Sequence, residues 1–131
     1  QVCRSLMELV DLYPTVADYC GVAAPHPLAG QSLRPRLENP AAKGRDAAFT
    51  LVTRGAGGYG QAVRTAGWRY IQWSDGRAEL YDELNDPEET RNLAGDSGHA
   101  ALVKEHQHLL ERVGPFTATE TRQPERRKRA K

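Results

Sequence analysis

The glycines between residues 55 and 60 could form a phosphate-binding loop, because they read G-x-G-x-x-G. Such a loop binds a dinucleotide only when a helix follows it, since N–H groups at the helix N-terminus bind the pyrophosphate. Residues 61–65 read Gln-Ala-Val-Arg-Thr and favour a strand instead. The motif is therefore interpreted as a connection between strands. Beside it, Arg54 and Tyr59 are candidates to bind an anionic substrate at the mouth of a cleft.

The histidines and acids do not have the spacing of a metal site. His106 and His108 are two residues apart on a predicted helix, so they point in different directions and are expected to be solvated. The acids from Asp82 onward lack the central glycine and terminal glutamate of a helix–loop–helix calcium site. Capping and turn formation explain Asp86 and Glu89 instead. We assign no catalytic and no metal-binding residue.

Aromatic and basic residues gather on the predicted strands, and two interpretations are open. They could stack single-stranded nucleic acid. They could also form a hydrophobic core with arginines at its rim, which strand propensities favour. The net charge of +1 does not indicate a nucleic-acid-binding chain, although the last ten residues are strongly basic. The residues concerned are Trp68, Tyr70, Trp73, Tyr81, Arg64 and Arg69.

The expected elements run from a helix through a connector to a sheet. Leu12 to Tyr19 has helical spacing of apolar residues, with Asp11 as its N-cap and Gly21 after its end. Cys20 is expected to be a buried, inert thiol. The prolines and glycines of residues 23–40 indicate a connector. Strands are expected at residues 47–53, 61–65, 68–73 and 78–81, with a hairpin turn at Asp75-Gly76.

Two further helices are expected after the strands. Asp86, Pro87 and Glu89 predict a short helix that starts with a capping box. Ser97 is expected to cap a last helix that runs to about Val113. The apolar stripe of that helix is Leu102, Val103, Leu109, Leu110 and Val113.

The fold class predicted from these elements is α+β. We expect a small antiparallel β-sheet of about four strands, packed by a C-terminal helix and preceded by a helix and a long connector. The expected regions are residues 1–40, residues 41–115, and a disordered basic tail at 116–131. No stretch approaches the roughly 18 apolar residues of a membrane span, and no signal peptide is recognisable.

Three stretches carry a resemblance to a known family. Residues 9–15 read Leu-Val-Asp-Leu-Tyr-Pro-Thr, and residues 28–37 contain Leu-x-Gly-x-Ser-Leu-x-Pro-x-Leu. Residues 63–70 hold Val-Arg-Thr and Arg-Tyr, and residues 79–94 read Glu-Leu-Tyr-Asp through Asp-Pro to Asn-Leu-Ala. In this order they resemble type I sulfatases of the alkaline phosphatase superfamily, and within them the iduronate-2-sulfatase-like group.

The resemblance implies that the chemistry lies elsewhere. In that family a formylglycine, made from a cysteine or serine in C/S-x-P-x-R, attacks the sulfate ester, and calcium steadies the sulfate. Neither Cys3 nor Cys20 begins such a motif. Calcium and formylglycine are thus implied for a full-length parent and not for this chain. Residues 1–40 would end the catalytic α/β domain, and residues 41–115 would be the C-terminal subdomain.

The leading hypothesis is a C-terminal fragment of a sulfatase that hydrolyses sulfate esters of sulfated sugars. The fragment alone is expected to be inactive and to shape the substrate cleft, with Thr53 to Tyr59 at its edge. Its implied partners are the missing N-terminal catalytic domain and the sulfated carbohydrate. Members of the family are usually exported, periplasmic or lysosomal, which leaves the compartment open. The alternatives are a stand-alone nucleic-acid-binding module and a vestigial interaction domain.

The hypotheses differ in what they require of the first helix. A fragment of a larger enzyme should leave a large apolar surface exposed there, because the missing domain would pack against it. A stand-alone module should bury its apolar residues in a core of its own.

Overall fold

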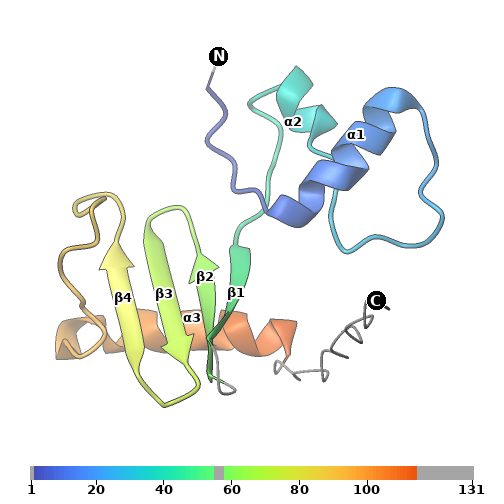
Figure 1. The fold of residues 1–131 in the computed structure, drawn as a ribbon. Coiled ribbons are helices and arrows are strands. Elements are labelled where there is room, and N and C mark those ends of the chain that lie inside the picture. The colour runs from blue at the N-terminus through green and yellow to red at the C-terminus, as the bar shows by residue number, and fades with distance from the viewer. Residues whose placement is uncertain (1, 55–57, 115–131) are drawn as a thin grey trace, which may run out of the picture.

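The computed structural model describes residues 2–54 and 58–114, and Figure 1 shows their fold. Two helices and a connector lead into a four-stranded sheet, and a long helix follows. The elements are α1 (Leu12–Cys20), α2 (Arg34–Glu38), β1 (Ala48–Arg54), β2 (Gly58–Arg64), β3 (Trp68–Trp73), β4 (Ala78–Asp82) and α3 (Ala100–Val113). The expected α+β class is confirmed. The predicted tail at residues 116–131 lies outside the described residues.

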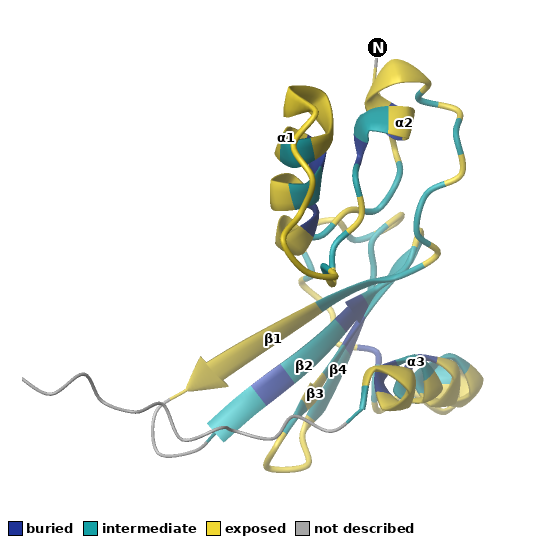
Figure 2. Ribbon diagram, turned by 90° about the vertical axis from the view of Figure 1, so that its right-hand side faces the viewer, coloured by how far each residue is buried: buried dark blue, intermediate teal, exposed yellow. Residues whose placement is uncertain are grey.

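The sheet is an antiparallel meander in the order β1-β2-β3-β4. Its register pairs Phe49 with Val63, Val63 with Tyr70 and Tyr70 with Leu80, so these side chains share one face. In Figure 2, which views the sheet nearly edge-on, α3 lies on one side of it and α1 with α2 on the other. We call the face toward α3 the core face and the opposite one the open face. Residues of the open face are Thr50, Val52, Arg54, Gly60, Ala62, Arg64, Arg69, Ile71, Trp73, Glu79 and Tyr81.

The hydrophobic core lies between the core face and α3. Val63, Tyr70 and Leu80 are fully buried, and Leu93 and Leu110 complete the cluster from the following loop and from α3. Burial contributes about 1.5–3 kcal/mol for each large apolar side chain. The predicted stripe of the last helix is confirmed where it meets this cluster, whereas its final residue, Val113, is exposed.

The segment after β4 is a loop, and the short helix predicted there is wrong. The Asp86 carboxylate accepts hydrogen bonds from the Thr90 N–H (3.1 Å), the Thr90 hydroxyl (2.9 Å) and the Arg91 N–H (2.9 Å). These hydrogen bonds to nearby backbone and hydroxyl groups stabilise a loop conformation and compete with helix formation. Glu89 has a left-handed backbone (φ 54°), and its side chain pairs with Arg69 instead of closing a capping box.

The start of the last helix also differs from the prediction. Asp96, not Ser97, supplies the cap, and its Oδ1 accepts the Gly98 N–H at 2.9 Å. A 3-10 turn over Ser97–His99 then leads into α3. The helix ends at Gly114 (φ 88°), as predicted. Aspartate and serine both suit this position, and the sequence offered one of each within two residues.

Asp11 links α1 to the sheet and is not the side-chain cap that was predicted. Its Oδ1 accepts the Gln31 N–H at 2.8 Å and its Oδ2 accepts the Glu8 N–H at 3.0 Å. Arg45 donates to both oxygens, at 2.5 and 3.2 Å. Glu8 in turn accepts the Phe49 N–H of β1 at 2.6 Å. Burial alone would raise the pKa of Asp11, but Arg45 and the two backbone N–H groups lower it to about 2.

α1 has nearly the predicted extent, and its large apolar side chains are exposed, as the sulfatase hypothesis requires. It ends at Gly21 in the left-handed conformation (φ 64°). The thiol of Cys20 is exposed, so the prediction that it is buried is wrong for the described chain. The large side chains of this region are at least half exposed, namely Leu9, Leu12, Tyr13, Val16, Tyr19 and Val22. None of the described helices is long and apolar enough to cross a membrane.

Candidate functional site

Arg54, the last residue of β1, lies on the open face against an aromatic ring. Its guanidinium carbon is 4.5 Å from the centroid of the Trp73 ring. A Cβ atom at Gly60 would stand 2.7 Å from that ring, so the missing side chain lets the indole lie against β2. The indole Nε1 donates to Glu79 at 2.7 Å. Among the residues that the structure describes, no carboxylate forms an ion pair with Arg54.

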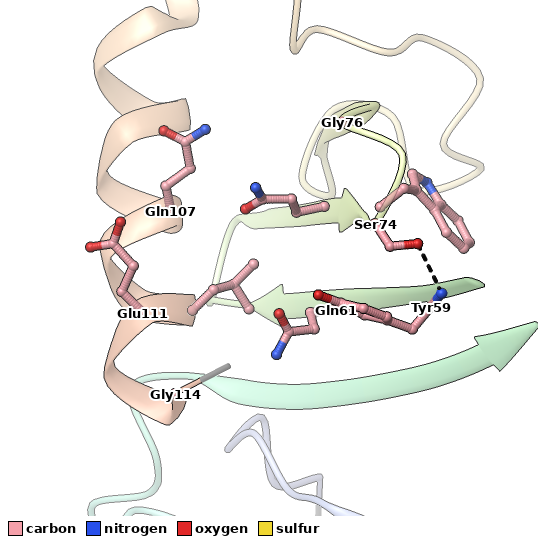
Figure 3. A pocket seen from close by; sticks show the side chains of 10 residues that line it. Tyr59, Gln61, Ser74, Gly76, Gln107, Glu111 and Gly114 are labelled. Atoms are coloured by element: carbon pink, nitrogen blue, oxygen red, sulfur yellow. Dashed lines mark hydrogen bonds between the residues drawn. The ribbon is translucent and has the colours of Figure 1, made fainter. Parts of the chain in front are cut away.

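Tyr59 lies on the core face, in a pocket of about 410 Å³ between the β3–β4 hairpin and the end of α3. Figure 3 shows Gln107 and Glu111 of α3 on one side of this pocket, with Tyr59 and Gln61 on the other. The Tyr59 N–H donates to the Ser74 hydroxyl at 3.1 Å. The lining mixes polar side chains with the apolar Leu110 and Trp73, and it contains no described arginine or lysine.

The structure does not bring Arg54 and Tyr59 together on one face. Arg54 pairs with Gly58, and Thr53 pairs with Tyr59, so the two side chains alternate to opposite faces around the same turn. Residues 55–57 of the predicted glycine loop lie outside the described residues. β2 begins at Gly58, and the strand expected after the glycines is confirmed. A dinucleotide loop would need a helix at this point.

A cluster of ion pairs lies on and beside the open face, and sequence reasoning missed it. Arg64 Nη1 is 2.8 Å from Glu83 Oε1, and Arg69 pairs with Glu89. The Arg69 guanidinium also lies 5.9 Å from the centroid of the Tyr81 ring. The register of β3 and β4 could have suggested the cluster. It sets Arg69 opposite Tyr81, so the acids that follow Tyr81 in the chain are expected near the arginines.

Two carboxyl groups of this cluster influence each other. Burial and the neighbouring Glu83 carboxyl raise the pKa of Glu89, while Arg69 opposes that shift. The pKa of Tyr81 is also raised, chiefly by burial and then by its hydrogen bond to Glu79 at 2.9 Å. The open face is therefore a part-buried, densely charged surface and not a simple basic patch.

Some arginine donors in this cluster have no acceptor. The Arg69 Nε–H is buried and makes no hydrogen bond. Arg64 Nη1 is close to Glu83, but the contact is misaligned for a hydrogen bond, so the pair is held by charge alone. Buried donors without partners are rare in folded proteins.

His106 is buried, so the prediction that it is solvated is wrong. Its Nδ1 lies 2.8 Å from the Leu102 carbonyl, which can only accept, so Nδ1 carries the proton. Nε2 lies 3.2 Å from the Thr65 hydroxyl, which is also 3.3 Å from the Trp68 carbonyl, so the two acceptors share one hydroxyl proton. His108 is exposed on α3, as expected. The helical period does not reveal which of two neighbouring histidines faces the sheet.

The aromatic residues divide between the two faces. Tyr70 is buried and Trp68 packs against the core, which confirms the hydrophobic interpretation for these two. Trp73 and Tyr81 lie on the open face under arginine side chains, so the prediction of one common core is wrong for them. A continuous stacking platform for bases is not formed by the four rings.

The residues present do not fit the formylglycine and calcium groups of the sulfatase resemblance. Cys3 and Cys20 are exposed, and neither begins C-x-P-x-R. No three His, Cys, Asp or Glu side chains within residues 2–54 and 58–114 form a group that could hold a metal ion. No reaction step is therefore assigned to a described residue.

Comparison with known proteins identifies the family. Residues 1–114 match the family described as N-sulphoglucosamine sulphohydrolase, C-terminal. The chain belongs to this family. The resemblance to the C-terminal part of type I sulfatases is thereby confirmed, as is the expected fold of that subdomain.

Individual relatives show the same correspondence. The chain is 34% identical over 109 residues to the delta 4,5-hexuronate-2-O-sulfatase of Bacteroides thetaiotaomicron, covering 78% of this chain and 22% of that protein. It is 37% identical over 103 residues to the arylsulfatase K of Rattus norvegicus, covering 69% and 18%. The chain thus spans about a fifth of the length of these relatives.

A solved structure aligns with the same part of the molecule. The structure of BT4656 in complex with its substrate D-glucosamine-2-N,6-O-disulfate has a TM-score of 0.70 and 31% identity. The alignment covers 79% of this chain and 23% of that one. The predicted C-terminal sulfatase subdomain therefore has a counterpart of known structure.

Proposed function

We propose that this chain is the C-terminal subdomain of an enzyme that hydrolyses sulfate esters of sulfated sugars. The family supports the sulfatase assignment, and the relatives named above support the substrate class. The chain would supply no catalytic group. Its part would be to dock against a catalytic α/β domain and to form one wall of the substrate cleft, with calcium and formylglycine held by that domain.

The exposed apolar face of α1 carries the proposal. Val16 is 61% exposed, and Leu12, Tyr13 and Tyr19 are exposed beside it. Soluble domains seldom leave so many large side chains on one helix open to water. A domain that packs against α1 would bury them, and since matching relatives are about five times longer than the aligned region, such a domain is available in the family.

The position of α1 supports a cleft beside the sheet. Both α1 and the open face lie on the side of the sheet away from α3 (Figure 2). A domain docked on α1 would therefore stand next to the open face and leave a crevice between the two. We propose that Arg54 contacts substrate in this crevice, and that Tyr59, on the opposite face beside the same turn, contacts substrate only at the rim of the crevice.

The nucleic-acid alternative has less support. It needs exposed aromatic rings on one face, and Tyr70 is fully buried. The basic residues of the tail lie outside the described residues. A vestigial interaction domain would also expose the apolar face of α1. Only the sulfatase activity of the complete protein would distinguish it from a sulfatase subdomain.

The docking step can be tested with one exposed valine. In the complete protein that carries this chain, Val16→Asp should lower the sulfatase activity and the thermal unfolding temperature, because it buries a charge between domains. Val16 is exposed in this chain, so the substitution should not disturb the chain itself. The control is Val113→Asp, at a valine that is similarly exposed (57%) but lies at the end of α3. Equal effects of the two substitutions would contradict docking through α1.

A further inference from the structure

The open face forms a groove that the proposed function does not by itself explain. Its volume is about 390 Å³, within the range of roughly 300–1,000 Å³ typical of ligand sites. Thr50, Gly60 and Ala62 line the groove. Because these residues are small, they leave the groove unfilled. Ile71 and Trp73 form an apolar wall.

An arginine stands toward each end of the groove. Arg54 is level with Gly58 beside the β1–β2 turn, whereas Arg69 is level with Arg64 and Ala48. The Arg54 guanidinium lies over Trp73, which is level with Val52, so four positions of β1 separate it from the level of Arg69, about 14 Å at roughly 3.4 Å per residue. One small anion cannot bridge this span. An extended ligand with anionic groups along its length could.

The two arginines differ in what they offer a ligand. Arg54 is stacked on Trp73, which fixes the guanidinium plane and leaves its N–H groups available at the edge. Arg69 is paired with Glu89, and 37% of its side chain stays exposed, whereas its Nε–H is buried and out of reach of a ligand. Between them lies the Glu79 carboxylate, which accepts from Trp73 and Tyr81 and can accept further hydrogen bonds from hydroxyl groups. The groove thus offers anion donors at its ends and a hydroxyl acceptor between them.

We propose that the open face binds an extended sulfated oligosaccharide, with one sulfate or carboxylate on Arg54, another toward Arg69, and sugar hydroxyls beside Glu79. The proposal rests on the proposed function, because the bound sugar would be the continuation of the chain whose sulfate is hydrolysed. The groove would add affinity for long substrates beyond the sugar unit at the reaction centre. It is separate from the Tyr59 pocket, which lies on the core face.

Binding of a sulfated, heparin-derived tetrasaccharide to the complete protein tests this directly, by isothermal titration calorimetry. Arg54→Gln should weaken binding about tenfold, as expected for the loss of one charge-assisted contact. Arg112→Gln removes the same charge from an exposed position on α3, away from the open face, and should leave the affinity unchanged. Equal affinities of the Arg54 and Arg112 variants would overturn the proposal.

A second pair of variants tests the floor of the groove. Val52 and Leu51 are neighbours on β1 with similar exposure, 46% and 42%, but they lie on opposite faces. Val52→Asp places a carboxylate in the groove and should weaken tetrasaccharide binding by at least tenfold. Leu51→Asp should not, once circular dichroism shows that both variants are folded. Similar losses in both variants would contradict a site on the open face.

Competition identifies the ligand, and hydrolysis separates this inference from the proposed function. Inorganic sulfate at the same concentration of sulfate groups should not displace the tetrasaccharide; displacement would overturn an extended site. A single-stranded oligonucleotide that binds equally well through Arg54 would overturn the saccharide assignment. Hydrolysis of a sulfated monosaccharide, too short to span the groove, tests the proposed function alone. Tetrasaccharide binding that depends on Arg54 would support the groove even if no sulfate were released.

Discussion

At the scale of single residues, the side chains that hold this chain together are those with several partners at once. Asp11 is fully buried and accepts hydrogen bonds from two backbone N–H groups and from Arg45, so it joins the first helix to the approach of β1. The sequence predicts a helix cap at Asp11, because an aspartate directly before a helical segment favours capping. The partners of Asp11 lie up to 34 residues away, and local sequence does not reveal them.

Asp11→Asn should destabilise the folded chain at pH 7. The substitution removes the charge of the buried Asp11 and leaves the part-buried Arg45 with Glu8 (3.4 Å) as its remaining carboxylate partner. The loss of the charge-assisted hydrogen bonds to Asp11 should cost about 1.5–3 kcal/mol. The matched control is Asp18→Asn, at an exposed aspartate paired with Arg34, where the loss should stay below about 1 kcal/mol. Urea denaturation of both variants measures the free energy of unfolding. Equal losses would show that Asp11 does not have the role we give it.

The difference between Asp11→Asn and the original chain should also depend on pH. The pKa of Asp11 is about 2 in the folded chain against an ordinary value of 3.8, so its carboxylate stabilises the fold fully above pH 4–5. That contribution falls as the pH drops toward 2, and the gap between the chains should narrow by about 2 kcal/mol. A gap that stays constant from pH 5 to pH 2 would argue against this pKa.

Glu89 shows the same limit of local reasoning. Asp-Pro-Glu-Glu is a good start for a helix, and the local pattern predicts one. In the structure, Arg69 on β3 forms an ion pair with Glu89. The Asp86 carboxylate accepts the Thr90 N–H and so stabilises a loop in this segment. A long-range ion pair therefore prevails over a local capping preference. His106 is similar, since its burial depends on where α3 meets Thr65.

At the scale of elements, the strands and helices were largely predictable. Alternating residues define the faces of β3, and Asp75-Gly76 defines the hairpin, where Gly76 adopts φ 88°. The boundaries were less accurate. β2 begins at Gly58, inside what looked like a glycine loop, because pairing with β1 holds these glycines extended. Pairing of this kind is a property of two strands and is not visible in either one alone.

The core under α3 gives a prediction at this scale. Leu80 of β4 is fully buried beside Tyr70, so Leu80→Ala should cost about 2–5 kcal/mol through lost burial and a cavity. Leu84, four residues later, is 75% exposed, and Leu84→Ala should change stability by less than about 0.5 kcal/mol. Thermal and urea unfolding followed by circular dichroism compares the two. A small effect at Leu80 would mean that the sheet does not pack on α3 as described.

At the scale of the whole molecule, one face of the sheet is covered by the chain's own helix and the opposite face is left exposed. α3 covers the core face, while α1 and the open face lie on the other side with large apolar and charged side chains exposed (Figure 2). The sequence motifs indicated the family, and the exposed first helix predicted from the sulfatase hypothesis is present. The ion pairs of Arg64 with Glu83 and of Arg69 with Glu89 were missed, because the positions of both acids depend on the loop after β4 as well as on strand register.

The most direct test of the central claim is the release of sulfate by the complete protein that carries this chain. Purified protein, with formylglycine formation verified by mass spectrometry, would be incubated with a sulfated disaccharide and calcium. Ion chromatography would measure free sulfate. We predict release of sulfate at a rate well above that of a sample without enzyme. No release from any of a panel of sulfated disaccharides, by a protein shown to be folded and to contain formylglycine, would contradict the sulfatase assignment.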